Sequence, residues 1–248
     1  MGASDTELAK LRAAKKAFDI VANLKPAIIG VGTGSTVDRF VELIPASSDA
    51  DVFSNAIFVC ASLYTMYRIK ELGYTVAIPS TIDRIDVYVD GADEVDGELN
   101  MVKGGGGAST LEKVLTYASL KRIYIVDYTK LVPRLCYRHP IPIEVLPEAL
   151  SIVYRKLTEL NLNPVIRRGC GGKHGFVVSD TRGVIVDIKP TNVTDFRKLE
   201  RTLKMIPGVV EVGLFIDLAD TVIVGYPDRV EILHKSPSNT VYEPFKYY

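Results

Sequence analysis

The chain has 248 residues, of which 47% are hydrophobic and 24% are charged, so it can bury the core of one large domain or of two modest ones. With 30 basic and 30 acidic residues its formal net charge is zero, which leaves no basic field for phosphate backbones and makes nucleic acid an unexpected partner. No apolar run reaches the roughly 18 residues that a membrane-spanning helix needs, so no membrane contact is expected.

The cysteines indicate a reducing compartment. Cys60, Cys136 and Cys170 are odd in number and widely spaced, with no C-x-x-C pair, which predicts free or buried thiols rather than disulfides or a zinc site. The N-terminal segment carries charges at helical spacing and lacks a long apolar core, so it predicts an amphipathic helix and not a signal peptide. We therefore expect a cytoplasmic protein.

Helical and strand patterns alternate over the first 130 residues. A helix is expected over 4–24, with an apolar stripe made of Leu8, Leu11, Ala14, Phe18 and Val21. Strands are expected at 27–31, 57–60, 75–78, 87–89 and 123–126, with helices ending near residues 43, 73 and 120 between them. This alternation predicts a parallel sheet wound by right-handed crossovers, in which ligands bind at the carboxyl ends of the strands.

After about residue 138 the pattern changes to a small α+β unit. Its strands are expected at 141–145, 165–167, 176–179, 184–188 and 209–214, and its helices at 148–160 and 194–205, an order close to a ferredoxin-like sandwich with an extra strand. The buried run 220–225 is expected to rejoin the first sheet. The fold class is therefore α/β: a Rossmann-like, doubly wound, mostly parallel sheet over 1–137 plus 215–248, which would be the catalytic domain, and a smaller α+β domain over 138–214.

The stretch 86–113 concentrates the groups that could move a proton. Asp90 ends an apolar strand, and Lys103 is followed by four consecutive glycines, Gly104 to Gly107. Consecutive glycines are costly in conformational entropy, so they predict a sharp turn or a close approach to a ligand, with a flexible hinge as the alternative. Glu112 is open to two interpretations, because Ser109-x-x-Glu112 also matches a capping box in which the glutamate only accepts a backbone hydrogen bond.

The segment 30–36, GVGTGST, joins a strand to a helix. Backbone amides and hydroxyls at a helix N-terminus bind anions such as phosphate, but Ser35 or Thr36 could equally be the N-cap of a tight turn. The segment matches neither the dinucleotide fingerprint nor a Walker loop.

Other polar groups give weaker signals. Asp90, Asp93, Glu94 and Asp96 could hold a magnesium ion, but some of them are expected to be solvated loop carboxylates. The isolated histidines His139, His174 and His234 predict neither a metal site nor a base. The basic cluster Arg167, Arg168 and Lys173 is typical of a solvated loop.

Taken together, the motifs resemble the ribose-5-phosphate isomerase A family. The resemblance rests on GVGTGST (30–36), DVYVDGADEVD (86–96), MVKGGGGA (101–108) followed by EK (112–113), VDYTK (126–130) and IPGVVEVGLF (206–215). These motifs occur in order over nearly the whole chain, and DGADE followed by KGGGGA is highly specific. One departure is Leu111, where family members commonly carry arginine.

The resemblance implies roles for individual residues. It implies that Glu112 is the general base, that Asp90 assists ring opening, and that Lys103 stabilises the enediolate. It places the sugar phosphate against the residues Thr33, Gly34, Ser35, Thr36, Asp90, Gly91, Ala92, Asp93, Lys103, Gly104, Gly105, Gly106 and Lys130. It also implies no metal and no cofactor, a small-molecule pentose 5-phosphate as the partner, and a homodimer or tetramer.

The predicted function is the interconversion of D-ribose 5-phosphate and D-ribulose 5-phosphate through an enediolate, in the non-oxidative pentose phosphate pathway. Moving a proton between C2 and C1 requires one carboxylate that serves both carbons and a donor for the developing oxyanion, and the residues supply both. The alternatives are a non-catalytic sugar-phosphate sensor, which would bind the sugar without exchanging its C2 proton, and an isomerase of another phosphosugar.

Overall fold

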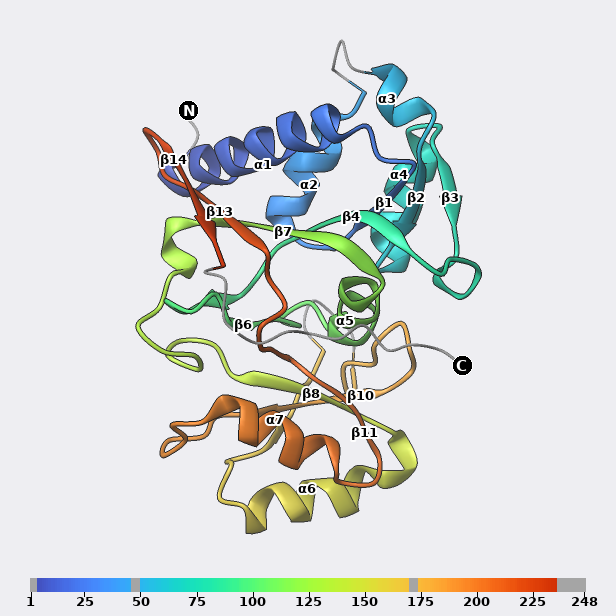
Figure 1. The fold of residues 1–248 in the computed structure, drawn as a ribbon. Coiled ribbons are helices and arrows are strands. Elements are labelled where there is room, and N and C mark those ends of the chain that lie inside the picture. The colour runs from blue at the N-terminus through green and yellow to red at the C-terminus, as the bar shows by residue number, and fades with distance from the viewer. Residues whose placement is uncertain (1–3, 46–49, 170–173, 236–248) are drawn as a thin grey trace, which may run out of the picture.

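A seven-stranded sheet forms the centre of the larger part of the molecule in the computed structural model, which describes residues 4–45, 50–169 and 174–235 (Figure 1). The strand order is β14-β13-β7-β4-β1-β2-β3, and all neighbours are parallel except β13 and β14. The strands are β1 (Ile28–Val31), β2 (Ile57–Cys60), β3 (Thr75–Ala77), β4 (Ile85–Asp90), β7 (Ser119–Asp127), β13 (Thr221–Gly225) and β14 (Val230–His234). The six parallel strands follow the Rossmann order, so the predicted mostly parallel sheet is confirmed, and the run 220–225 rejoins it as β13.

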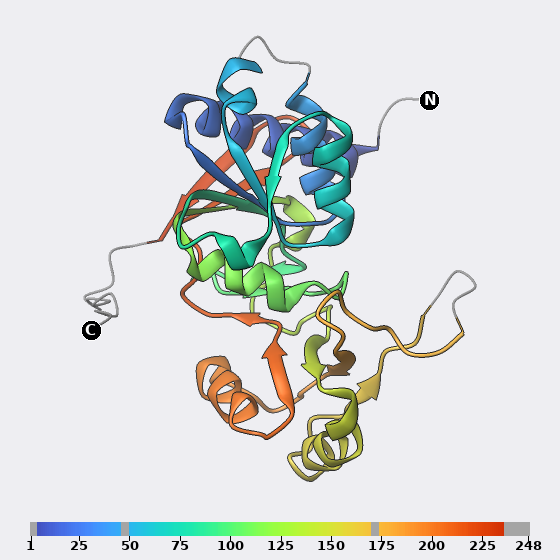
Figure 2. The same ribbon diagram turned by 90° about the vertical axis from the view of Figure 1, so that its right-hand side faces the viewer.

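Helices cover both faces of this sheet. One face carries α1 (Asp5–Leu24), α2 (Ser35–Leu43) and α4 (Leu63–Glu71), whose apolar side chains share a core with β1 and β4. The other face carries α5 (Ser109–Tyr117), which lies between the large sheet and the small one (Figures 1 and 2). The short α3 (Ala50–Ser54) precedes β2.

The buried face of α1 differs from the predicted stripe. Leu8 and Leu11 are 36% and 42% exposed, whereas the buried face is rich in alanine. A Cβ atom on Gly225 of β13 would lie 1.9 Å from the carbonyl oxygen of Ala9, so α1 packs directly on the strand. Small residues allow this close approach, and the leucines turn outward; the predicted stripe was therefore wrong at its first two positions.

The smaller part is a four-stranded antiparallel sheet with two helices. Its strands, in the order β11-β8-β10-β9, are β8 (Ile141–Val145), β9 (Val165–Ile166), β10 (Val184–Ile188) and β11 (Val209–Val212). With α6 (Leu150–Glu159) and α7 (Phe196–Lys204) they follow the βαββαβ order of the ferredoxin-like sandwich. The extra strand expected at 176–179 was wrong, because that segment makes only isolated bridges from Phe176 and Val178.

Three short strands join the two parts: β5 (Glu94–Val95), β6 (Met101–Val102) and β12 (Leu214–Phe215) form a three-stranded sheet. Two-residue strands are too short to show a period of two in the sequence, so none of them was predicted. The 3₁₀ helices Pro79–Thr81, Tyr128–Lys130 and Pro147–Ala149 complete the described elements. Helix α5 ends at Tyr117, not near residue 120, because β7 already begins at Ser119.

No helix within the described ranges is long and apolar enough to cross a membrane. Cys60 and Cys136 are buried free thiols. Cys170, Lys173 and the aromatic tail over 236–248 lie outside the described residues.

Candidate active site

A cavity of about 360 Å³ opens at the carboxyl edge of the large sheet, where the chain leaves β1 and β4. The connection after β1 leads to α2 on one face and the connection after β4 leads to α5 on the other, so this is the point in the sheet where ligands bind in open α/β folds. The lining is 33–37, Ser62, Tyr64, 91–93, 103–108, Glu112, Lys130 and 178–180. Every predicted site residue lines the cavity except Asp90, which lies behind its wall.

Asp90 is completely buried and heavily hydrogen-bonded. Its carboxylate accepts hydrogen bonds from the Tyr88 hydroxyl at 2.6 Å and from the backbone amides of Gly91 and Thr33 at 2.7 and 3.2 Å. A Cβ atom on Gly32 would lie 1.8 Å from Asp90 Oδ1, so only glycine lets the first turn approach this carboxylate. Tyr88 and Asp90 lie on the same face of β4, because side chains alternate along a strand.

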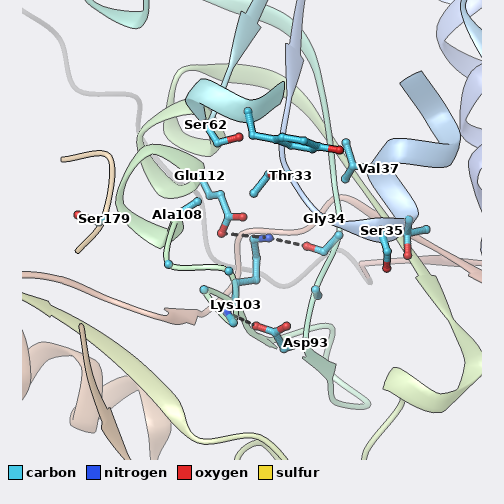
Figure 3. A pocket seen from close by; sticks show the side chains of 18 of the residues that line it. Thr33, Gly34, Ser35, Val37, Ser62, Asp93, Lys103, Ala108, Glu112 and Ser179 are labelled. Carbon is cyan, nitrogen blue, oxygen red and sulfur yellow. Dashed lines mark hydrogen bonds and ion pairs between the residues drawn. The ribbon is translucent and has the colours of Figure 1, made fainter. Parts of the chain in front are cut away.

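Lys103 links Asp90 to Glu112. Its ammonium nitrogen lies 2.8 Å from Asp90 Oδ2 and donates a 2.5 Å hydrogen bond to the Gly91 carbonyl. The same nitrogen lies 3.4 Å from Glu112 Oε2, and a dashed line marks this ion pair in Figure 3. Burial by itself would lower the pKa of Lys103, but the carboxylates of Asp90 and Glu112 outweigh it and hold that pKa well above its usual range. Lys103 therefore stays a cation and cannot serve as the base.

Glu112 is buried on the first turn of α5, with its carboxylate at the cavity. Its Oε2 atom has no hydrogen-bond partner within the described residues, since the contact with Lys103 is an ion pair without hydrogen-bond alignment. Burial, opposed by the Lys103 charge and assisted by Asp90, raises the pKa of Glu112 to about 8. The site therefore binds and releases a proton near neutral pH.

The capping-box interpretation of Glu112 was wrong. Helix α5 has Ala108 as its N-cap, without a side-chain cap hydrogen bond, and the Glu112 amide donates to the Ala108 carbonyl. Ser109 is the first helical residue, and its hydroxyl has no partner among the described residues. Leu111, which stands where the family commonly has arginine, packs half-buried against the core on the α5 side of the sheet.

The glycine run forms a tight turn rather than a hinge. Gly104 and Gly107 have φ values of +100° and +81°, which favour glycine, and the Gly107 amide donates to the Gly104 carbonyl. The Gly105 amide donates a 2.7 Å hydrogen bond to Asp93 Oδ2, as Figure 3 shows. A Cβ atom on Gly105 would lie 2.7 Å from Asp93 Oδ1, so this carboxylate packs directly on the turn.

The turn after β1 presents backbone amides to the other end of the cavity. Gly34, with φ +117°, is the N-cap of α2 and makes no side-chain cap hydrogen bond, so the expectation of Ser35 or Thr36 as the N-cap was wrong. The amides of the first helical turn have no acceptor within a helix, and they favour an anion. Lys130, half-buried at the end of the 3₁₀ helix Tyr128–Lys130, also lines the cavity.

Some lining residues were not predicted. Ser62 and Tyr64 follow β2 at the same sheet edge, and the rule that located the turn after β1 could have located them too. The segment 178–180 comes from the connection between β9 and β10, and Asp180 accepts a 2.8 Å hydrogen bond from the Leu63 amide. No local pattern in the sequence indicates this contact.

The acidic cluster does not act as one unit. Glu94 is buried, not solvated, and accepts hydrogen bonds from the backbone amides of Tyr137, Arg138 and His139. Asp96 accepts from the amides of Glu98 and Asn100 in a local turn. Within the described ranges, no group of three or more His, Cys, Asp or Glu side chains is arranged to hold a metal ion. None of the histidines lines the cavity.

Fold and site together define an α/β protein that can bind a small anionic ligand and move a proton on it. A buried carboxylate with a raised pKa faces a fixed cation, and turns with exposed amides lie on two sides.

Comparison with known proteins supports the same class. The family model for ribose 5-phosphate isomerase A (phosphoriboisomerase A) matches residues 57–229. Ribose-5-phosphate isomerase A of Pyrococcus horikoshii is 38% identical over 231 residues, which are 93% of this chain and 100% of that protein. The enzyme of the same name from Aeropyrum pernix is 43% identical over 216 residues, 86% of this chain and 89% of that protein. A solved D-ribose-5-phosphate isomerase in complex with phospho-erythronic acid is 37% identical with a TM-score of 0.86, covering 94% of this chain and 100% of that one.

The chain therefore belongs to the ribose-5-phosphate isomerase A family and is an aldose–ketose isomerase.

Proposed function

We propose that this isomerase interconverts D-ribose 5-phosphate and D-ribulose 5-phosphate with Glu112 as the single base that moves the proton between C2 and C1. The observation that carries this assignment is the Glu112 carboxylate, which is buried, lines the cavity and lies 3.4 Å from the Lys103 cation. A carboxylate at the cavity wall can accept a substrate proton, and a pKa raised to about 8 by burial makes that transfer favourable near neutral pH.

Lys103 would stabilise the negative charge of the enediolate. It keeps its charge, it lies between the two carboxylates, and it lines the cavity beside Glu112. A preorganised cation in a water-poor site stabilises developing charge without having to reorient during the reaction. The amides of the glycine turn would contribute further donors to the same oxygens.

Asp90 would assist the opening of the furanose ring through Lys103 and not by direct contact. Its carboxylate is fully occupied by Tyr88, two backbone amides and the ammonium group. This arrangement supports a role in holding Lys103 in position, as a charged hydrogen-bond donor, while the ring opens.

The phosphate group would bind at the N-terminus of α2, on Thr33, Gly34, Ser35 and Thr36, with Lys130 as the second contact. Gly91, Ala92 and Asp93 would line the sugar between the two turns. The solved relative in complex with phospho-erythronic acid supports binding of a small phosphorylated sugar acid or sugar in this class of cavity.

We also propose a division of the chain into a catalytic domain over 1–137 plus 215–248 and a small domain over 138–214. Separate buried clusters around the large and the small sheet support it. A homodimer or tetramer stays a prediction, and gel filtration of a monomer at working concentration would contradict it. A cytoplasmic location also stays a prediction, supported by the buried free thiols Cys60 and Cys136.

The test is NMR of ribose 5-phosphate with the protein in D2O and excess EDTA. We expect ribulose 5-phosphate with deuterium at C1, because a base that exchanges with solvent returns deuterium to the ketose. Glu112→Gln should lower turnover by about 1000-fold or more while the variant still binds substrate, since general-base catalysis contributes up to about 10⁴-fold.

Glu148→Gln is a control, because Glu148 is exposed and lies outside the cavity. Near-normal turnover by Glu112→Gln would exclude Glu112 as the base. Binding of ribose 5-phosphate without ketose formation by the wild type would exclude the reaction itself.

A further inference from the structure

Arg167 contacts the glycine turn from the small sheet. Its Nη1 atom donates hydrogen bonds to the carbonyl oxygens of Gly104 and Gly105, at 3.0 and 2.8 Å. Its Nε and Nη2 atoms donate to the two carboxylate oxygens of Asp187, at 2.8 and 2.5 Å. The sequence pattern suggested a solvated basic loop here, and for Arg167 that interpretation was wrong.

The Arg167–Asp187 pair is held rigidly. Asp187 lies in β10 opposite Val165 of β9, and the Arg167 amide donates to the Ile185 carbonyl of β10, so both partners are fixed to neighbouring strands. Both side chains are only 17% exposed. A bidentate arginine–carboxylate pair fixes the plane of the guanidinium, and here it directs the remaining N–H group at the turn.

Arg167 fixes the directions of two peptide groups in the turn. A trans peptide is planar, so its carbonyl and its amide point in opposite directions. In the first peptide, Arg167 holds the Gly104 carbonyl and Asp93 holds the Gly105 amide. In the second, Arg167 holds the Gly105 carbonyl, so the Gly106 amide must point away from Arg167. That amide has no acceptor among the described residues, and Gly106 lines the cavity.

We propose that Arg167, fixed by Asp187, is a positioning residue that aims the Gly106 amide into the cavity for the isomerisation. Arg167 does not line the cavity, so it acts through the turn and not on the substrate. Through this contact the small sheet lowers the activation barrier of the isomerisation. The inference rests on the proposed function, in which the glycine turn stabilises the enediolate.

The test is a comparison of Arg167→Lys with a matched control, Arg122→Lys. Arg122 of β7 forms the same kind of bidentate pair with Asp220, the residue before β13, and this pair is 25% and 35% exposed and lies outside the cavity. Lysine keeps the charge but cannot bind a carboxylate in bidentate fashion and two carbonyls at once. We expect Arg167→Lys to lower kcat by about 10- to 100-fold, because a misplaced group in an active site costs up to about 100-fold.

The effects on kcat and on KM, measured separately, distinguish a positioning role from a merely structural one. Loss of an interaction made only in the transition state lowers kcat and leaves KM within about threefold, and Arg122→Lys should change neither value by more than that. A kcat for Arg167→Lys equal to that of Arg122→Lys, or a change in KM alone, would overturn the proposal.

If Arg167→Lys does not fold, Asp187→Asn carries the same test. It keeps Arg167 but removes the charge that orients it, so kcat should fall with KM unchanged, and an unchanged kcat would overturn the proposal. Failure of the proposed function is recognised separately, because then the wild type itself would not form ribulose 5-phosphate, or Glu112→Gln would remain active.

Discussion

Two glycine-containing turns line the same cavity, but they are held in place differently. The turn 32–36 is a strand-to-helix junction held within the large sheet, by the Asp90 carboxylate of β4 against Gly32 and Thr33 and by the start of α2. The turn 103–107 is also held from the small part of the molecule, from which Arg167 donates to two of its carbonyls. Asp93 accepts from one of its amides, and the Gly213 carbonyl accepts from the Lys103 amide.

The difference follows from what each turn has to do. An anion at a helix N-terminus needs amides that the helix itself aligns, so a junction within one sheet can supply them. An enediolate needs donors placed where charge develops during the reaction, and their geometry has to be enforced from several sides. Changes at the first turn should therefore act mainly on KM, and changes at the second turn and its neighbours mainly on kcat.

Among variants of the two turns, Lys103→Met should have the largest effect. Loss of this cation should lower kcat by about 100- to 1000-fold, the usual effect of removing a donor from a site of this kind. The variant also leaves two buried carboxylates unpaired, which should lower the free energy of unfolding by about 3–5 kcal/mol. Steady-state kinetics and urea denaturation measure the two effects, and Lys121→Met, at an exposed position of β7, is the control. An unchanged kcat would show that Lys103 and its turn do not contribute to the chemical step.

The pH dependence of kcat/KM should come from Glu112, which lies on the side of the cavity that carries the turn 103–107. Because burial raises the pKa of Glu112 to about 8, the base is increasingly protonated below that pH. We expect kcat/KM to fall about tenfold between pH 9 and pH 7, since this ratio reports the ionisation of the free enzyme. The substrate phosphate titrates near pH 6, below this window. A flat profile from pH 9 to pH 7 would mean that Glu112 is already ionised.

The smallest expected effect comes from the phosphate end. Lys130→Ala should raise KM by about tenfold. A charge-assisted contact contributes roughly 1.5–3 kcal/mol to binding, and the partial exposure of Lys130 to solvent weakens this contact. The value of kcat should stay within about twofold, since the same contact exists in the ground state and in the transition state. Lys70→Ala, on the exposed side of α4, is the control. A fall in kcat at constant KM would contradict the division between the two turns.

Much of this arrangement could be predicted from the sequence because its signals are local. Alternating strand and helix patterns indicated the parallel sheet, and the position of Asp90 at the end of β4 brought it to the edge where the turn after β1 begins. The two roles of Glu112 could not be separated in the sequence, because a capping box and a catalytic glutamate share the same spacing. The helix start at Ala108 decided between them.

What the sequence by itself determined was the class of sheet, the two turns, and the set Asp90, Lys103 and Glu112, because periodicity and glycine runs depend on neighbours along the chain. Only the tertiary structure decided how these groups are held: the ion pairs of Lys103, the raised pKa of Glu112, and the contacts of Arg167 with the glycine turn and of Asp180 with the start of α4. Burial and hydrogen bonding between residues more than sixty positions apart depend on packing of the whole chain, and no local pattern contains them.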